Sequence, residues 1–192
     1  QVLDADIDKA LEASSKILKV RGRVIPATVQ EISLLAEMED GTVVAGESQI
    51  PKSGKRIKRV FTEPALPRPE GAALRAIDEA DAVILGPGSL YTSIMPNLLI
   101  DKIADHVRNC KAPKFYICNV MTQPGETDGY TAADHVAALQ RLAGDSIIDN
   151  VLVNDMPFTD DVINKYKEKG AEPVRVDIDR LDAMGVRTIR AN

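Results

Sequence analysis

Segments with strand and helix patterns alternate from residue 71 onwards, and this alternation constrains the fold more than any other feature. Apolar runs of strand length occur at residues 82–85, 115–120, 151–154 and 174–176, and helical patterns precede them at 71–79, 96–110, 131–142 and 160–169. Two strands joined through a helix lie parallel, because the crossover returns the chain to the same end of the sheet. The sequence therefore predicts a Rossmann-like α/β fold with three layers and a mostly parallel sheet.

Residues 23–62 differ from this pattern and predict a small β-rich insert within the domain. Four runs with strand character lie in it, at residues 24–28, 33–38, 42–46 and 57–61. The Asp40-Gly41 pair between the two middle runs is typical of a hairpin turn. A stiff, proline-rich connector follows at residues 64–69.

Both ends of the chain have patterns that predict truncated elements. A helical pattern at residues 5–18 begins close to Gln1, and the chain closes on a strand pattern at 186–192. We therefore expect residues 1–192 to form one domain that is incomplete at both ends.

Composition excludes several classes of partner. A net charge of −5 gives no overall attraction to nucleic acid or to an anionic membrane. Two separated cysteines, Cys110 and Cys118, fit a reducing compartment, and with two histidines we expect no metal site. No apolar run approaches the ~20 residues of a membrane span, and no signal-peptide pattern opens the chain. We expect a cytoplasmic protein without a membrane span.

The strand at residues 82–85 leads into a glycine-rich loop, which is the first candidate ligand site. Its candidate residues are Gly86, Gly88, Ser89 and Thr92. Ligands bind outside the carboxyl ends of parallel strands, where glycines let the backbone approach a phosphate and hydroxyls donate to it. The alternative is a tight turn in which the glycines satisfy the backbone angles and a serine caps the next helix.

A second polar loop follows the next predicted strand and should emerge at the same edge of the sheet. It is rich in side chains that donate and accept hydrogen bonds, which suits a ligand with sugar hydroxyls or amides. The candidates are Asn119, Thr122, Gln123 and Glu126. The alternative is a solvated turn before a helix that Thr131 or Asp128 caps.

Other polar residues have weaker assignments. Asn154 ends a predicted strand and either lines the pocket or shapes a turn, and Tyr166 either stacks on a base or packs. His106 and His135 are interpreted as ordinary residues of surface helices rather than as acid–base groups. The basic run at 55–59 is interpreted as the solvent face of a strand, with contact to an acidic partner as the alternative.

Taken together, two segments closely resemble the YvcK branch of the CofD-like family, also known as the gluconeogenesis factor or UDP-sugar-binding family. Residues 86–99 read GPGSLYTSIMPNLL, and residues 119–127 read NVMTQPGET. The resemblance extends through the chain and includes residues 153–155 and 172–174.

The resemblance implies a Rossmann-like cytosolic bacterial protein that binds UDP-N-acetylglucosamine and similar UDP-sugars. Its implied role is regulatory and concerns growth on gluconeogenic carbon, cell-wall synthesis and cell shape. It also implies that Tyr166 contributes to UDP-sugar binding. The expected partner is a nucleotide sugar, and whether the chain forms a homo-dimer is left open.

The sister branch of the family provides the alternative function. It is the 2-phospho-L-lactate transferase of coenzyme F420 biosynthesis, which this chain resembles at residues 86–87, 92–94 and 96 but not at 119–127. Such an enzyme would use a nucleotide-activated substrate and a divalent metal such as Mg2+. Family members also carry a glycine-rich strand-turn-helix, an acidic segment and a basic tail that this sequence lacks, so part of the site is expected outside it.

Overall fold

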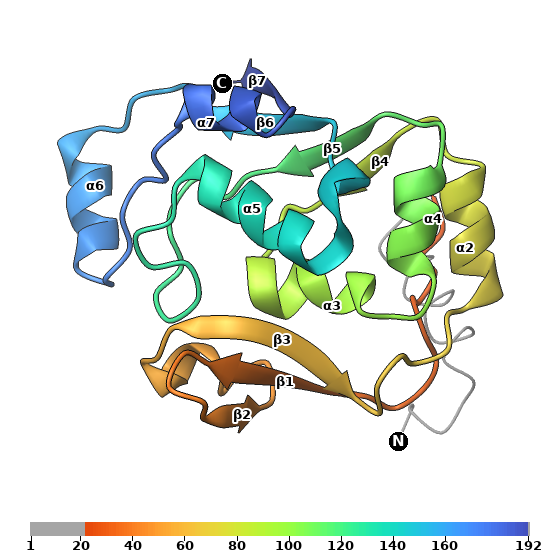
Figure 1. Ribbon diagram of the computed structural model, residues 1–192. Helices are drawn as coiled ribbons and strands as arrows, with labels where there is room; N and C mark the ends of the chain where they lie inside the picture. The colour runs from red at the N-terminus through yellow and green to blue at the C-terminus, as the bar shows by residue number, and fades with distance from the viewer. Residues whose placement is uncertain (1–21, 192) are drawn as a thin grey trace.

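The computed structural model describes residues 22–191, so the helix predicted at residues 5–18 lies outside the described part. A parallel sheet organises most of the chain (Figure 1). Its strand order is β4-β5-β6-β7, and each neighbouring pair is parallel. The strands are β4 (Val83–Leu85), β5 (Lys114–Ile117), β6 (Asn150–Asn154) and β7 (Arg187–Ala191). The predicted α/β class with a mostly parallel sheet is confirmed.

A second, antiparallel sheet contains three strands in the order β2-β1-β3. These are β1 (Ser33–Met38), β2 (Val43–Ala45) and β3 (Ile57–Glu63), with a short 3-10 turn η1 (Pro51–Ser53) before β3. The predicted hairpin turn forms at Asp40-Gly41, where the Thr42 amide donates to Asp40 Oδ1 over 2.9 Å. The strand predicted at 24–28 is wrong: Pro26 has no N–H for a sheet ladder, and this stretch is irregular.

Three of the predicted helices form close to their expected bounds, as α2 (Gly71–Asp78), α5 (Ala132–Ala143) and α6 (Asp160–Lys167). The helix predicted at 96–110 is instead broken into α3 (Met95–Leu98) and α4 (Ile103–Asn109), and a π-helical turn η2 (Leu90–Ile94) precedes α3. The break falls at Lys102, whose φ of 65° is left-handed and incompatible with a continuous α-helix.

The strand predicted at 174–176 is also wrong. The segment makes only isolated bridges, Met121 with Pro173 and Thr131 with Arg175, so it crosses loop segments instead of joining the sheet. The remaining elements are the helix α7 (Ile178–Ala183) and the turn η3 (Asp145–Ile147). The sequence patterns did not predict α7. The last sheet position belongs to β7, which pairs with β6.

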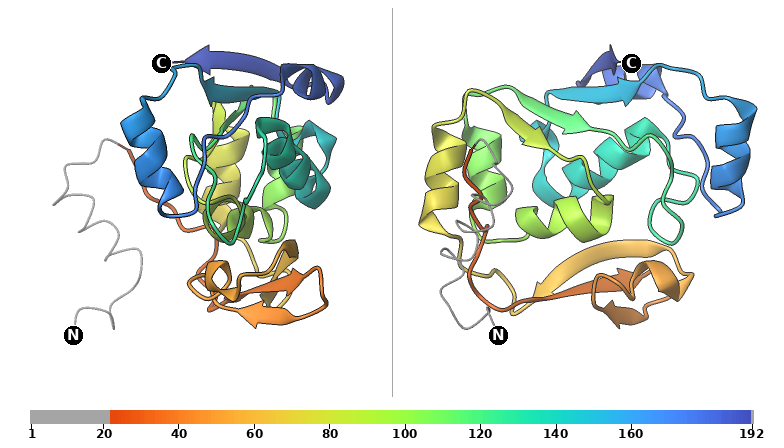
Figure 2. Two further views of the ribbon diagram at one scale, coloured as in Figure 1. Left: turned by 90° about the vertical axis from the view of Figure 1, so that its left-hand side faces the viewer. Right: turned by 180° about the vertical axis from the view of Figure 1, so that it is seen from behind.

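The strand β4 lies at the edge of the described sheet. Its central residue Ile84 is 58% exposed, and its described strand neighbour is β5 alone. Figure 2 shows β4 running along this edge in the view from behind.

The core joins the two sheets through α3, which lies between β3 and α5 (Figure 1). Met38 and Val60 of the antiparallel sheet belong to the same buried apolar cluster as Met95, Leu139 and Val151. Burial at roughly 25 cal/mol per Å2 of apolar surface makes such a cluster the main stabilising contribution. Among the helices of residues 22–191, none combines the length and apolarity needed to cross a membrane.

Candidate ligand-binding site

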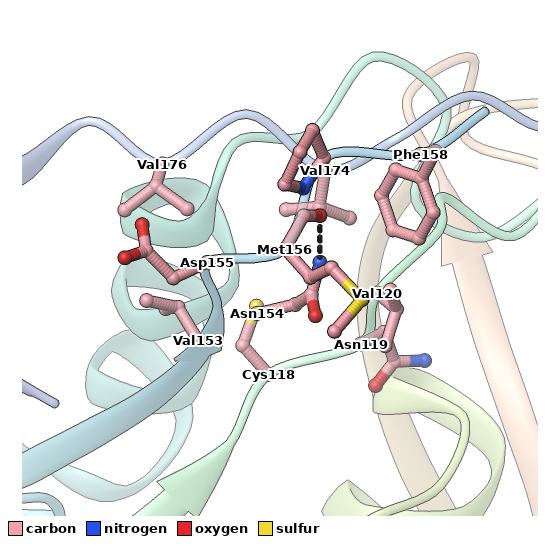
Figure 3. Close-up of a pocket in the computed structure, with 11 residues that line it drawn as sticks. Cys118, Asn119, Val120, Val153, Asn154, Asp155, Met156, Phe158, Val174 and Val176 are labelled. Atoms are coloured by element: carbon pink, nitrogen blue, oxygen red, sulfur yellow. Dashed lines mark hydrogen bonds between the residues drawn. The ribbon is translucent and has the colours of Figure 1, made fainter. Parts of the chain in front are cut away.

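A cavity of about 260 Å3 lies at the carboxyl ends of β5 and β6 (Figure 3). One wall is formed by residues 118–120 after β5, and a second by residues 153–158 at the end of β6. Val174 and Val176 of the crossing segment form the third wall. Parallel strands leave a crevice at this end because their connections diverge to different helices, and ligands of such folds bind there.

Two predicted residues, Asn119 and Asn154, line this cavity together. Asn154 donates from Nδ2 to the Met156 carbonyl over 2.8 Å, which fixes the turn after β6. Asn119 Oδ1 is buried, and it finds no hydrogen-bond partner among the described residues. In Figure 3 the Asn119 side chain turns away from Val174 and Val176. An unpaired buried acceptor costs about 1–3 kcal/mol, so a rotation of the Asn119 side chain toward a donor in the cavity would be favourable.

Polar and apolar atoms contribute about equally to the cavity surface, and Asp155 adds a carboxylate that pairs with Arg190 over 3.4 Å. Val120 and Met156 are 45% and 55% exposed, so apolar surface remains available to a ligand. Burial raises the pKa of the Cys118 thiol to about 12, which keeps it neutral and unsuited to act as a nucleophile. The combination of apolar side chains with a few polar groups is typical of small-molecule sites.

The two predicted loops meet at Glu126, which is 5% exposed. Its Oε1 accepts from Thr92 Oγ1 and from Gln123 Nε2, each over 2.8 Å. Its Oε2 accepts from the Tyr91 amide over 3.2 Å. Burial raises the pKa of Glu126, and the hydrogen bonds from Thr92 and Tyr91 oppose this rise. Glu126 therefore connects the two loops, because its carboxylate accepts hydrogen bonds from the first residues of the π-helical turn.

The glycine-rich loop lies directly beside the second loop. A Cβ on Gly86 would come within 3.2 Å of the Ile117 carbonyl, and its φ of 96° favours glycine. A Cβ on Gly88 would come within 3.2 Å of the Ser93 Cβ. The Ser89 carbonyl accepts from the Ser93 and Ile94 amides. These glycines therefore have a packing role, while their contact with a ligand stays a prediction.

The structure separates two other candidates from the cavity. Thr122 is buried, and its hydroxyl accepts from the Glu172 amide over 3.0 Å. Tyr166 lies on α6, is 42% exposed and is not among the residues lining the cavity. The nine other residues that line the cavity were not predicted as site residues, and Met156, Phe158 and Val176 are among them. Met156 and Phe158 could have been predicted, because they closely follow the end of a strand. Val176 could not, because only the path of the crossing segment brings it to the cavity.

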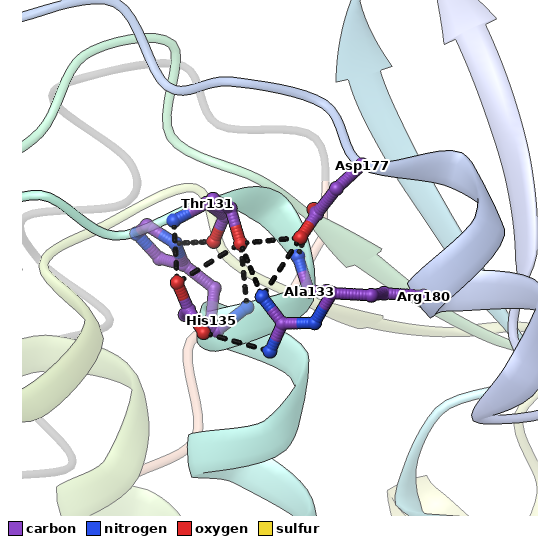
Figure 4. Close-up of polar contacts among 6 residues, drawn as sticks. Thr131, Ala133, His135, Asp177 and Arg180 are labelled. Carbon is purple, nitrogen blue, oxygen red and sulfur yellow. Dashed lines mark hydrogen bonds and ion pairs between the residues drawn. The ribbon is translucent and has the colours of Figure 1, made fainter.

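A polar network fixes the start of α5, the helix that follows the second loop (Figure 4). The Thr131 side chain caps the helix by accepting from the Asp134 amide, and the Thr131 amide in turn donates to the Asp134 carboxylate. Asp177 accepts from the Ala133 amide over 2.9 Å and pairs with Arg180 at the same distance. The predicted cap by Thr131 is confirmed. His135, expected on a surface helix, is instead completely buried, and burial lowers its pKa.

We expect Asp177→Ala to lower the free energy of unfolding by about 1–2 kcal/mol, because the Ala133 amide loses its acceptor and Arg180 keeps only Asp134 as a carboxylate partner. Urea unfolding measures this change. Asp179→Ala, a substitution of an exposed aspartate two residues further on, is the control and should change stability by less than about 0.5 kcal/mol. Equal effects of the two substitutions would contradict the role of the network.

The structure is that of an α/β protein with a cavity at the carboxyl edge of its parallel sheet, which is the candidate small-molecule site. The family model described as 2-phospho-L-lactate transferase CofD matches residues 1–192, so the chain belongs to the CofD family. It is 51% identical over 187 residues to the gluconeogenesis factor of Halalkalibacterium halodurans, covering 97% of this chain and 58% of that protein. It is 52% identical over 188 residues to the gluconeogenesis factor of Bacillus subtilis, covering 98% and 59%.

The comparison of structures agrees with the comparison of sequences. A crystal structure of a UPF0052 family member from Bacillus halodurans superposes with a TM-score of 0.93 at 51% identity. The match covers 97% of this chain and 60% of that one. The chain therefore spans less than two thirds of the length of the relatives it matches.

Proposed function

We propose that this protein binds a nucleotide sugar of the UDP-N-acetylglucosamine type at the carboxyl edge of its parallel sheet. The observation that carries this proposal is that Asn119, a lining residue of the cavity, has a buried Oδ1 with no hydrogen-bond partner among residues 22–191. The apolar side chains of the walls suit the flat face of a base, and Asn119 would accept a hydrogen bond from an N–H or O–H group of the ligand.

The proposed biological role is regulatory and linked to gluconeogenic growth, with cell-wall synthesis and cell shape as further proposed outputs. Support comes from relatives at about half identity that carry the name gluconeogenesis factor. A cytoplasmic location is proposed with it.

Titration calorimetry of the full-length protein with UDP-N-acetylglucosamine tests the binding. We expect Asn119→Ala to weaken affinity by about tenfold, because one buried hydrogen bond is lost. The control is Asn97→Ala, since Asn97 is exposed and donates only to the Ser93 carbonyl of its own helical segment. Equal affinity of Asn119→Ala and the parent protein would overturn the assignment of the cavity.

The alternative is a transferase of the kind that the family model describes. Within residues 22–191, no three or more His, Cys, Asp or Glu side chains are grouped as metal ligands, so we derive no metal-assisted step from them. Incubation with Mg2+ and a nucleotide-activated substrate distinguishes the two functions, because only the transferase releases free nucleotide.

A further inference from the structure

A second, larger cavity lies between the antiparallel sheet and α5. It measures about 520 Å3 and shares none of its lining residues with the cavity at the carboxyl edge. Residues 56–58 around the start of β3 form one side, and the turn at 128–130 with α5 forms the other. We call this cavity the basic groove. In Figure 1 β3 runs below α3 and the loop that precedes α5.

Two of the four cationic side chains that line the basic groove have no ion-pair partner among residues 22–191. Arg56 and Arg141 both line it, and neither forms an ion pair with another residue in the 22–191 range. The other cations are occupied: Lys58 pairs with Glu37, and Arg180 pairs with Asp134. Guanidinium groups bind phosphate and carboxylate groups in a bidentate manner, so two unpaired ones in a single groove are suited to a doubly anionic ligand.

The acidic residues of the basic groove only partly oppose such a ligand. Asp128 accepts from the Gly125 amide over 2.7 Å, and Asp134 takes part in the capping network with Arg180. Glu39, a further lining residue, lies next to β1. Its carboxylate repels an anion near that end of the groove. The proposed ligand therefore lies toward the end formed by α5.

A hydroxyl donor also faces this groove. The Tyr91 and Tyr130 hydroxyls lie 2.8 Å apart, and Tyr130 lines the groove whereas Tyr91 is 3% exposed. Burial raises the pKa of Tyr91, so its hydroxyl remains protonated and can donate to Tyr130. Either hydroxyl can be the donor in this contact, and when Tyr91 donates, the Tyr130 proton is free for a ligand in the groove.

We propose that the basic groove binds a compact polyanion with two phosphate groups, held by Arg56, Arg141 and Tyr130. The proposal does not depend on the nucleotide-sugar function, because the two cavities are lined by different residues. A polyanion here would contact the turn at 128–130, which belongs to the same loop as Asn119 and Glu126.

Titration calorimetry of the full-length protein with inorganic pyrophosphate tests the proposal, with and without saturating UDP-N-acetylglucosamine. We expect binding in both conditions, and we expect Arg141→Ala and Arg56→Ala each to weaken it by about tenfold or more. Arg187→Ala is the matched control, since Arg187 is an exposed arginine of β7 outside the groove, and it should leave pyrophosphate affinity unchanged. Thermal melts establish that each variant is folded. We expect Arg141→Ala to fold normally, because Arg141 is exposed.

Three results would overturn the proposal: no pyrophosphate binding by the parent protein, unchanged affinity in Arg141→Ala, or an equal loss in Arg187→Ala. Complete loss of pyrophosphate binding when UDP-N-acetylglucosamine is added would also overturn it, because it would assign the anion to the other cavity. If UDP-N-acetylglucosamine itself fails to bind, the arginine-dependent pyrophosphate signal still decides the question.

Discussion

Replacing Gly125 with alanine is expected to lower the free energy of unfolding by more than about 3 kcal/mol. A Cβ at this position would lie 1.9 Å from the Pro51 carbonyl oxygen and 2.7 Å from its carbonyl carbon. Both partners are backbone, so no side-chain rotation relieves the clash. The φ of 80° adds the cost of a left-handed conformation for a residue with a side chain. Urea unfolding monitored by circular dichroism measures the change.

Gly129→Ala provides a control from the same loop. Gly129 has a comparable φ of 69°, but a Cβ there would meet no atom within 4 Å. It should therefore cost only the conformational penalty of about 1–2 kcal/mol. The difference between the two variants isolates the contact of the loop with the antiparallel sheet. If Gly125→Ala were no more destabilising than Gly129→Ala, the close approach to Pro51 would be refuted.

Glu126→Ala is expected to destabilise the protein by about 2–4 kcal/mol. It removes the acceptor of the Tyr91 amide, the Thr92 hydroxyl and the Gln123 amide group in a site that is 5% exposed. The two loops would then lose their connection, so we also expect weaker binding of UDP-N-acetylglucosamine. Chemical unfolding and calorimetry on the same samples measure the two effects.

Glu126→Gln separates the hydrogen bonds from the charge. It retains the shape and an amide oxygen for the Tyr91 amide, and its NH2 group can donate to the Thr92 hydroxyl or to a rotated Gln123 amide. It also removes the cost of ionising a carboxyl whose pKa burial raises. We expect a change within about 1 kcal/mol. A loss as large as that of Glu126→Ala would show that the negative charge, rather than the hydrogen bonds, holds the loops together.

Much of the fold could be predicted from the sequence because helical and strand periodicities are local properties. The parallel strands β4, β5 and β6 and the helix α5 with its Thr131 cap follow from such patterns. The break at Lys102 could not be predicted, since its left-handed conformation arises from how neighbouring segments pack. Val174–Val176 resembles a strand by composition, but hydrogen bonds to loop carbonyls such as that of Val120 determine its path.

The site was predictable to a different degree. Asn119 and Asn154 were expected at one sheet edge because strand ends of a parallel sheet converge, and they do line one cavity. The pairing of Glu126 with Thr92 could not be predicted, because the carboxylate occupies the position expected for a phosphate and only tertiary contacts reveal it. Tyr166, a candidate from the family resemblance, lies on α6 and is not among the lining residues of this cavity, so its contact with a ligand stays a prediction.

A crystal structure of the full-length protein with UDP-N-acetylglucosamine tests the central claim most directly. The account predicts ligand density at the carboxyl ends of β5 and β6, with a ligand N–H or O–H group within hydrogen-bond distance of Asn119 Oδ1. Density elsewhere, with Asn119 Oδ1 still without a partner, would contradict it.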